Sequence, residues 1–236
     1  LGAWVREAME GKKPDTDAVR KMADAWVQLV LDIQAAKISH GDLQHDNVMV
    51  VGNTPVLVDY DGMCVPALAD PKKPLDQLEF GKPAYQHPGR PADKLGLHLD
   101  HFAAWVILIA LRATAADPAL YTRFVVHTDN ENLLFSPPDM ATPADSILWP
   151  ELLKCKDPEV RDWAKLARGA LDKPFDQVPA FCLDPFSALR KMVAALPRDW
   201  AGIAAETDRL TKAGKKLPPD LVAAAEADQR LQEALE

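Results

Sequence analysis

The chain has 236 residues, of which 48% are hydrophobic and 26% are charged, and its formal net charge is −8. This composition is that of a globular chain long enough for one large domain with an extension, and the acidic balance argues against nucleic acid as a main partner, because phosphate backbones favour clustered Lys and Arg. The longest apolar run, Phe102 to Leu111, has ten residues, whereas a membrane span needs about 20, so we expect a buried core helix and no membrane span in this chain.

The first elements are a short helix, a long amphipathic helix and a β-hairpin. Residues 1–10 indicate the end of a segment followed by a short helix, and Asp15 begins a run with apolar residues at helical spacing that continues to about Lys37. A polar loop, Ser39 to Asn47, comes next. The β-branched runs Val48–Val51 and Val56–Val58 follow it, separated by four turn-forming residues, which predicts a hairpin.

The rest of the chain is predicted to be helical after one long loop. Residues 59–95 show no sustained periodicity, and a loop of that length is functional or disordered. Leu97–Ala113 is apolar on most sides, which indicates a central core helix, and Asp157-Pro158 is a helix start for residues up to Leu171. Residues 203–236 predict two exposed helices broken at Gly214 to Pro219. We therefore expect a mainly α (α+β) fold, with a domain at 1–196 and a helical extension or linker at 197–236.

One segment carries side chains suited to phosphoryl transfer. It runs from His40 to Asn47, continues through the hairpin and ends at Asp59-Tyr60-Asp61-Gly62. Phosphoryl transfer needs a group that orients the attacking hydroxyl and takes its proton, and Mg²⁺ that neutralises phosphate charge. Mg²⁺ prefers hard oxygen ligands. A loop with one Asp for the hydroxyl and an Asn for the metal, beside a strand end with another Asp, meets these needs.

The spacing of these residues resembles the protein kinase-like superfamily. Asp42 and Asn47 are five apart, as in the catalytic loop H-R-D-L-x-x-x-N, and Asp59 follows the hairpin where the metal-binding D-F-G would stand. Further along, Gly81 to Pro88 resembles the G-T-x-x-Y-x-A-P-E segment that closes a kinase activation loop. Asp100, twelve residues after Pro88, heads the apolar helix. The resemblance is to the C-terminal lobe of Ser/Thr protein kinases, a helical bundle with a small β-hairpin at the catalytic loop, in a His-Gly-Asp version.

The resemblance implies a role for each site residue, with ATP and Mg²⁺ as cofactors. Asp42 would be the catalytic base, Asn47 a metal ligand and Asp59 the main Mg²⁺ ligand. Asp59-Tyr60-Asp61-Gly62 allows either aspartate to be the main metal ligand. Asp59 is preferred because it directly follows the apolar strand, and Asp61 would then assist the metal or open a turn with Gly62. Gln44 stands where a Lys commonly touches the transferring phosphate. Asp100 would hold the backbone of the catalytic loop from below.

The chain also departs from the family pattern. Gly41 stands where most protein kinases have an Arg that pairs with a phosphorylated activation loop, which argues against that form of control. Gly89-Arg90 replaces the Glu after Pro88, so the usual buried ion pair with a distant Arg is absent or rearranged. The family places its Gly-rich loop and its lysine on an N-terminal β lobe before Leu1. The resemblance thus implies half an ATP site, inactive as an isolated fragment.

Three functions follow from this resemblance. The first is ATP-dependent phosphorylation of a protein Ser/Thr hydroxyl by the intact protein, with a protein substrate as partner. The second is phosphorylation of an aminoglycoside-like or choline-like small molecule, which His-Gly-Asp and Gln44 favour. The third is a pseudokinase that serves as a binding module. The cysteines Cys64, Cys155 and Cys182 lie far apart, which predicts free thiols and a cytoplasmic location.

Overall fold

The fold is that of a computed structural model, which describes residues 1–11, 13–66, 81–91, 96–182, 192–195, 198–212, 217, 219–226 and 228–235. The chain divides into two compact units, Leu1–Phe181 and Cys182–Glu236. The division predicted from the sequence lay between residues 196 and 197, which are outside the described residues, so it stays a prediction. The fold is mainly helical with one small antiparallel sheet, as expected.

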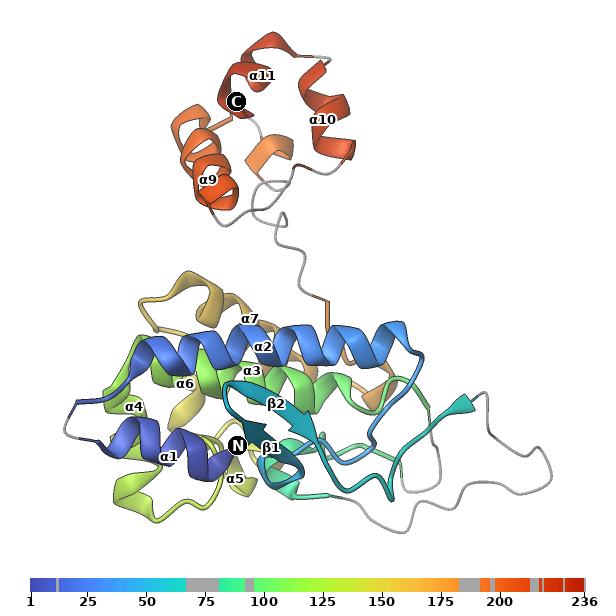
Figure 1. The fold of residues 1–236 in the computed structure, drawn as a ribbon, viewed down its shortest axis with the longest axis vertical. Coiled ribbons are helices and arrows are strands. Elements are labelled where there is room, and N and C mark those ends of the chain that lie inside the picture. Colours follow the sequence, from blue (N-terminus) through green and yellow to red (C-terminus); the bar gives the residue numbers. More distant parts are fainter. Residues whose placement is uncertain are drawn as a thin grey trace. The chain divides into compact units, whose positions relative to one another are not determined.

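The first unit is built on two long helices that run alongside each other (Figure 1). α2 (Thr16–Ala35) begins where Asp15 accepts a hydrogen bond from the Ala18 amide, over 3.0 Å. α3 (His101–Ala116) is buried on nearly all sides, and the Trp26 indole of α2 donates to its Ala104 carbonyl over 3.1 Å. The central core helix predicted from the apolar run is therefore present.

The bounds of α3 differ from the predicted Leu97–Ala113 at both ends. Residues 97–100 form a turn, in which the Leu99 amide donates to the Gly96 carbonyl. The helix then continues to Ala116 and stops at Asp117, because the following Pro118 disfavours a helical conformation for the residue before it.

The hairpin follows the polar loop directly. β1 (Val48–Val51) pairs antiparallel with β2 (Thr54–Leu57), with Val48 opposite Leu57. The second strand begins at Thr54, two residues before the predicted Val56, because Gly52 and Asn53 alone make the turn. Gly52 has a φ of 62° and Asn53 is not in the positive-φ region, a pattern typical of a type II′ turn.

Shorter helices complete the first unit. α1 (Gly2–Glu10) contacts α2. The Asp157 side chain caps α7 (Pro158–Ala170), as predicted, and α7 packs on α3. Along the chain between α3 and α7 come α4 (Pro118–Phe124), α5 (Pro137–Ala141) and α6 (Leu148–Leu152). Of the predicted long loop at 59–95, residues 67–80 and 92–95 lie outside the described residues, and the described part contains a short 3₁₀ turn at Pro83–Tyr85.

The second unit contains three described helices around its own apolar core. These are α9 (Trp200–Lys212), α10 (Pro219–Glu226) and α11 (Gln229–Leu235). The prediction of two exposed helices was wrong in this respect, because apolar side chains from all three helices meet in one cluster that includes Ile203, Leu221 and Leu231. The buried side chains recur at helical spacing in helices that are otherwise polar, which explains why composition alone did not reveal the core.

Among the described residues, no single helix is both long and apolar enough to cross a membrane. α3 and the segment Pro118–Thr128 pass that test only as a pair bent by 116°. Cys64 and Cys155 are buried and Cys182 is exposed, all as free thiols.

Candidate active site

Asp100 anchors the backbone of the polar loop. Its carboxylate is buried just before α3, where Oδ2 accepts from the His40 amide over 2.5 Å and Oδ1 accepts from the Gly41 amide over 2.8 Å. Burial raises the pKa of the Asp100 carboxyl, and these two hydrogen bonds oppose that rise. The two bonds confirm the contact that the resemblance predicted, and they fix the chain immediately before Asp42.

Asp42 and Asn47 are in direct contact within the loop. Asn47 Nδ2 donates to the Asp42 main-chain carbonyl and to Asp42 Oδ2, both over 2.9 Å, and Gln44 Nε2 donates to the same Oδ2 over 2.9 Å. All three side chains are buried. Asp42 Oδ1 has no hydrogen-bond partner. One oxygen of the carboxylate is therefore held by two donors, and the other is buried without a partner.

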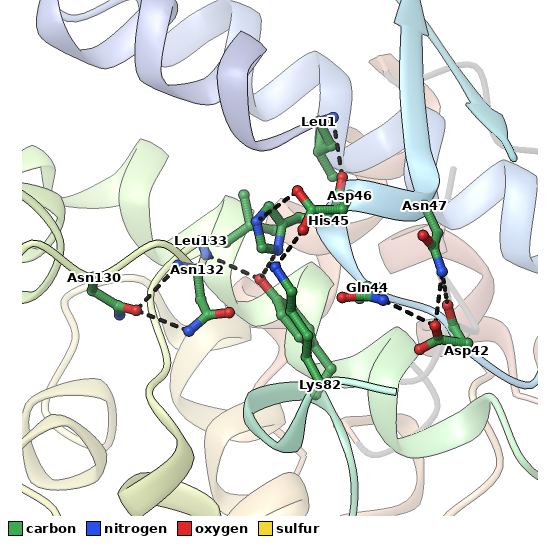
Figure 2. A network of polar contacts seen from close by, with 11 residues as sticks. Leu1, Asp42, Gln44, His45, Asp46, Asn47, Lys82, Asn130, Asn132 and Leu133 are labelled. Carbon is green, nitrogen blue, oxygen red and sulfur yellow. Dashed lines mark hydrogen bonds and ion pairs between the residues drawn. The ribbon is translucent and has the colours of Figure 1, made fainter. Parts of the chain in front are cut away.

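The orientation of the Asn47 amide follows from these bonds, because only its NH₂ group can donate to the two Asp42 oxygens. Its carbonyl oxygen points away from Asp42 (Figure 2). Mg²⁺ takes oxygen ligands, and this orientation leaves the Asn47 amide oxygen, not its nitrogen, directed away from Asp42.

The backbone places Asp59 beside this pair. Val58 precedes it, and the Val58 amide donates to the Asn47 carbonyl over 3.0 Å, while the Val58 carbonyl lies 3.0 Å from His40 Nε2. Both peptide groups of Val58 are thus tied to the polar loop. Asp59 itself has a φ of 66° and an exposed side chain. A positive φ is uncommon for a residue other than glycine and concentrates at functional positions.

Asp61 lies two residues further on, in a turn closed by the Met63 amide and the Tyr60 carbonyl over 3.0 Å. Its side chain is exposed. Both roles considered for Asp61, metal ligand and turn residue, therefore stay open, although the turn itself is present. In the described part of the chain no three His, Cys, Asp or Glu side chains converge as a metal cluster. The expected set of Asp59, Asn47 and Asp61 has the composition of a Mg²⁺ site completed by phosphate oxygens and water.

Gln44 is oriented toward Asp42. Its NH₂ group is used by Asp42 Oδ2, and its Oε1 is buried without a partner. An amide in this position supplies no positive charge. Contact between Gln44 and a transferring phosphate stays a prediction, and the role that the structure gives Gln44 is to hold the Asp42 carboxylate.

A second polar network, which the sequence did not predict, is built on His45 and Asp46 of the loop (Figure 2). The Leu133 amide donates to the Tyr85 hydroxyl over 3.0 Å, and that hydroxyl lies 2.7 Å from His45 Nδ1. His45 Nε2 lies 3.2 Å from Asp46 Oδ1, and Lys82 pairs with Asp46. Because the Asp46 carboxylate can only accept, a neutral His45 carries its proton on Nε2, and its Nδ1 then accepts from the Tyr85 hydroxyl.

Burial determines the charge state of this network. It lowers the pKa of His45, which Asp46 opposes and Lys82 reinforces, and it raises the pKa of the Tyr85 hydroxyl. A neutral His45 can accept from Tyr85 and donate to Asp46 at the same time. The network therefore fastens Tyr85, in the segment at 81–88, to the turn that holds Asn47.

A groove of about 520 Å³ opens beside this network. One side is formed by α1, including Arg6 and Glu10, and the other by Asp46, Tyr121 and Leu133. His45 and Asp46 of the polar loop line this groove, but Asp42 and Asn47 do not, so the groove is separate from the Asp42 carboxylate.

The sequence pattern identified Asp42, Asn47 and Asp100 correctly as residues that meet at one place, but it assigned no role to His45 or Arg90. The contact of His45 with Tyr85 and that of Arg90 with Gly41 each join residues far apart in the sequence, so spacing alone gives no signal for them. The only signal for Arg90 was its position in place of an expected Glu.

Comparisons with known proteins identify no relatives for this chain. No family model matches it, and neither a curated protein nor a solved structure does.

Proposed function

We propose that this chain carries the catalytic half of an ATP-dependent phosphotransferase, which in the intact protein phosphorylates Ser or Thr hydroxyls of a protein substrate. The kinase-like C-terminal lobe, ATP and Mg²⁺ are part of the same proposal. The observation that carries it is the Asp42 carboxylate, held at Oδ2 by Asn47 and Gln44 and unpartnered at Oδ1.

In the proposed reaction Asp42 Oδ1 accepts a hydrogen bond from the acceptor hydroxyl. The oxygen of the acceptor hydroxyl attacks the γ-phosphorus of ATP, and its proton passes to Asp42. The bond between this phosphorus and the β–γ bridging oxygen breaks, and ADP leaves. Asn47 and Gln44 keep the carboxylate from rotating. A base held in a single orientation raises the reaction rate beyond what its proton affinity alone provides, because the reacting atoms must be aligned.

The metal ligands in this proposal are Asn47 through its Oδ1, Asp59 through its carboxylate, and Asp61 as an additional candidate. When bound, Mg²⁺ would neutralise charge on the phosphate oxygens. The chain supports this arrangement in two ways. The oxygen of the Asn47 amide makes no contact with Asp42 that would occupy it. The two hydrogen bonds of the Val58 amide and carbonyl hold the backbone just before Asp59 against the loop.

The face of the hairpin away from the core supports a further lobe above the site. Met49, Val51 and Val56 are each more than a third exposed, as is Tyr60 just after the hairpin. Exposed apolar groups gathered beside a functional site are typical of a surface that another part of the protein covers. An N-terminal β lobe with the remaining ATP contacts would cover them.

The test is phosphoryl transfer by the intact protein with labelled ATP, Mg²⁺ and generic protein acceptors. We expect Asp42→Ala to lower kcat by orders of magnitude, since it removes a member of a catalytic unit. Asp176→Ala, a change of the same kind at an exposed aspartate in a 3₁₀ turn, should leave kcat unchanged. Equal transfer by the wild type and Asp42→Ala would refute the proposal.

The same assay separates the other two functions. His40-Gly41-Asp42 and Gln44 favour the small-molecule alternative, so amino sugars and choline should be supplied in parallel with proteins. Label only on the small alcohol identifies a small-molecule kinase. No transfer to any acceptor, with ATP binding intact, identifies a binding module.

A further inference from the structure

Arg90 connects the polar loop to the segment at 81–90. Its Nη2 donates to the Gly41 carbonyl over 2.6 Å, and its Nη1 donates to Gln86 Oε1 over 2.5 Å. Gly41 is the residue before Asp42, and its amide is already bound by Asp100. Arg90 therefore holds the peptide group that joins Gly41 to Asp42, while Asp100 holds the preceding peptide group.

The charge of Arg90 lies between two buried carboxylates. Burial lowers the pKa of the guanidinium, and the charges of Asp100 and Asp42 oppose this effect. An arginine keeps its proton under ordinary conditions, so Arg90 brings a permanent positive charge to a part of the loop where Asp42 and Asp100 would otherwise be close and uncompensated. Its planar group can also satisfy two acceptors in fixed directions.

Gly81 shows how tightly the segment at 81–90 packs against Asp42. A Cβ on Gly81 would lie 2.1 Å from Asp42 Oδ1 and 2.8 Å from Gln86 Nε2. Both atoms therefore face the same side of Gly81, and neither has a hydrogen-bond partner. Because Arg90 holds Gln86 by its Oε1, it sets the position of a side chain that borders the free oxygen of Asp42.

We propose that Arg90 is a positioning residue, which locks the Gly41–Asp42 peptide and Gln86 into one arrangement and so holds Asp42 Oδ1 in its reactive orientation. This inference rests on the proposed function. Arg90 itself touches neither ATP nor the acceptor in it. Its loss should therefore lower the rate of the chemical step and leave nucleotide affinity nearly unchanged.

The experiment measures phosphoryl transfer by the intact protein and its Arg90→Ala and Arg90→Lys variants. For Arg90→Ala we expect kcat to fall about 100-fold, as is typical for small misplacements of a reacting group, with KM for ATP unchanged within about twofold. Added guanidinium ion should restore part of kcat. Arg90→Lys should recover only part of the activity, because an ammonium group cannot reproduce the two-pronged geometry.

Arg112→Ala is the matched control. Arg112 is also largely buried, and its Nη2 pairs with Asp24 over 2.5 Å, joining α3 to α2. Its removal should lower thermal stability and leave kcat of the folded enzyme unchanged, with no response to guanidinium. If Arg90→Ala behaves like Arg112→Ala in all of these respects, Arg90 is an ordinary structural residue and the inference is wrong.

Hydrogen exchange keeps the inference testable apart from the proposed function. In Arg90→Ala the amides of residues 41–44 should exchange faster than in the wild type, while Arg112→Ala should leave them unchanged. If the wild type transfers no phosphate, the proposed function fails, and this measurement alone decides whether Arg90 holds the loop. Unchanged exchange at 41–44 would then overturn the inference.

Discussion

Gly41 and Gly62 bring the polar loop and the segment after the hairpin into backbone contact. Gly41 has a φ of 80°, and a Cβ at this position would lie 2.1 Å from the Gly62 carbonyl oxygen. No side chain fits there without moving one of the two backbones. The glycine before Asp42 is thus a steric requirement of the approach that brings Asp59 beside Asn47, and an arginine at position 41 would prevent that approach.

The first prediction concerns this contact. Gly41→Ala should lower the stability of the first unit by about 1–3 kcal/mol through backbone strain and collision, and it should reduce phosphoryl transfer because the segment at 59–62 must move. Gly52→Ala is the control, since Gly52 has a φ of 62° but nothing within 4 Å of its would-be Cβ. Thermal unfolding and kcat of both variants check this. Equal losses in the two variants would show that collision with Gly62 is unimportant.

The second prediction separates Asp59 from Asp61. Asp59 follows Val58, whose amide and carbonyl contact Asn47 and His40. Asp61 lies two residues later, in an exposed turn. We expect Asp59→Asn to lower kcat by at least about 100-fold and to raise the Mg²⁺ concentration for half-maximal rate, because it removes a hard anionic ligand. Asp61→Asn should change either value less than about threefold by the same reasoning.

A Mg²⁺ titration of the transfer rate for the wild type and both variants measures this difference. A larger effect of Asp61→Asn than of Asp59→Asn would exchange the roles of the two aspartates.

The third prediction is a loss of stability in mild acid. Burial lowers the folded-state pKa of His45, His87 and His101 from an ordinary value of 6.5. Above 6.5 both the folded and the unfolded chain carry neutral imidazoles, so the contribution to stability is complete. As the pH falls below 6.5, the unfolded chain binds protons first, and stability declines by at most about 1.4 kcal/mol per pH unit for each histidine.

His87 offers the cleanest variant for this measurement. Its Nε2 lies 3.1 Å from the Ala170 carbonyl and its Nδ1 accepts from the Gly89 amide over 3.0 Å, so a second proton would cost the Gly89 bond. His87→Asn should flatten the decline in unfolding temperature between pH 6.5 and 5. The same slope in the wild type and in His87→Asn would show that this histidine titrates alike in both states.

The sequence predicted those parts of the site that depend on local spacing. Asp42, Gln44 and Asn47 lie within six residues, so a short loop brings them together whatever surrounds it, and the hairpin returns the chain to the same place. The role of Asp100 was implied by the resemblance to the kinase family, which has an Asp at this place before the apolar helix. In each case the pattern of apolar and polar residues limits where the chain can run.

The parts that the sequence did not predict depend on tertiary approach. The reach of Arg90 to Gly41 spans 49 residues and that of Tyr85 to His45 spans 40, and no periodicity reports such contacts. The core of the second unit depends on apolar positions in three separate helices. Composition averages over these positions, so it predicted exposed helices where a small core forms.

The last prediction uses backbone strain to test whether Asp59 is kept for its carboxylate. Asp59 has a φ of 66°, a conformation that costs a residue with a Cβ about 1 kcal/mol and costs glycine little. Asp59→Gly should therefore be more stable than Asp59→Ala by about 1 kcal/mol, which reverses the usual order of the two residues in ordered structure. Both variants lack the carboxylate, so both should lose phosphoryl transfer to the same extent.

Lys37, with a φ of 55° at the end of α2, provides the control pair. Lys37→Gly should likewise be more stable than Lys37→Ala, but neither change should affect transfer, since Lys37 is exposed. Chemical denaturation and kcat of the four variants measure both effects. We expect glycine to relieve the strain at both positions, but only Asp59→Gly should lose activity. That result would mean that Asp59 is retained for its chemistry at a cost in stability. Full activity in Asp59→Gly would remove Asp59 from the proposed metal site, whatever its effect on folding.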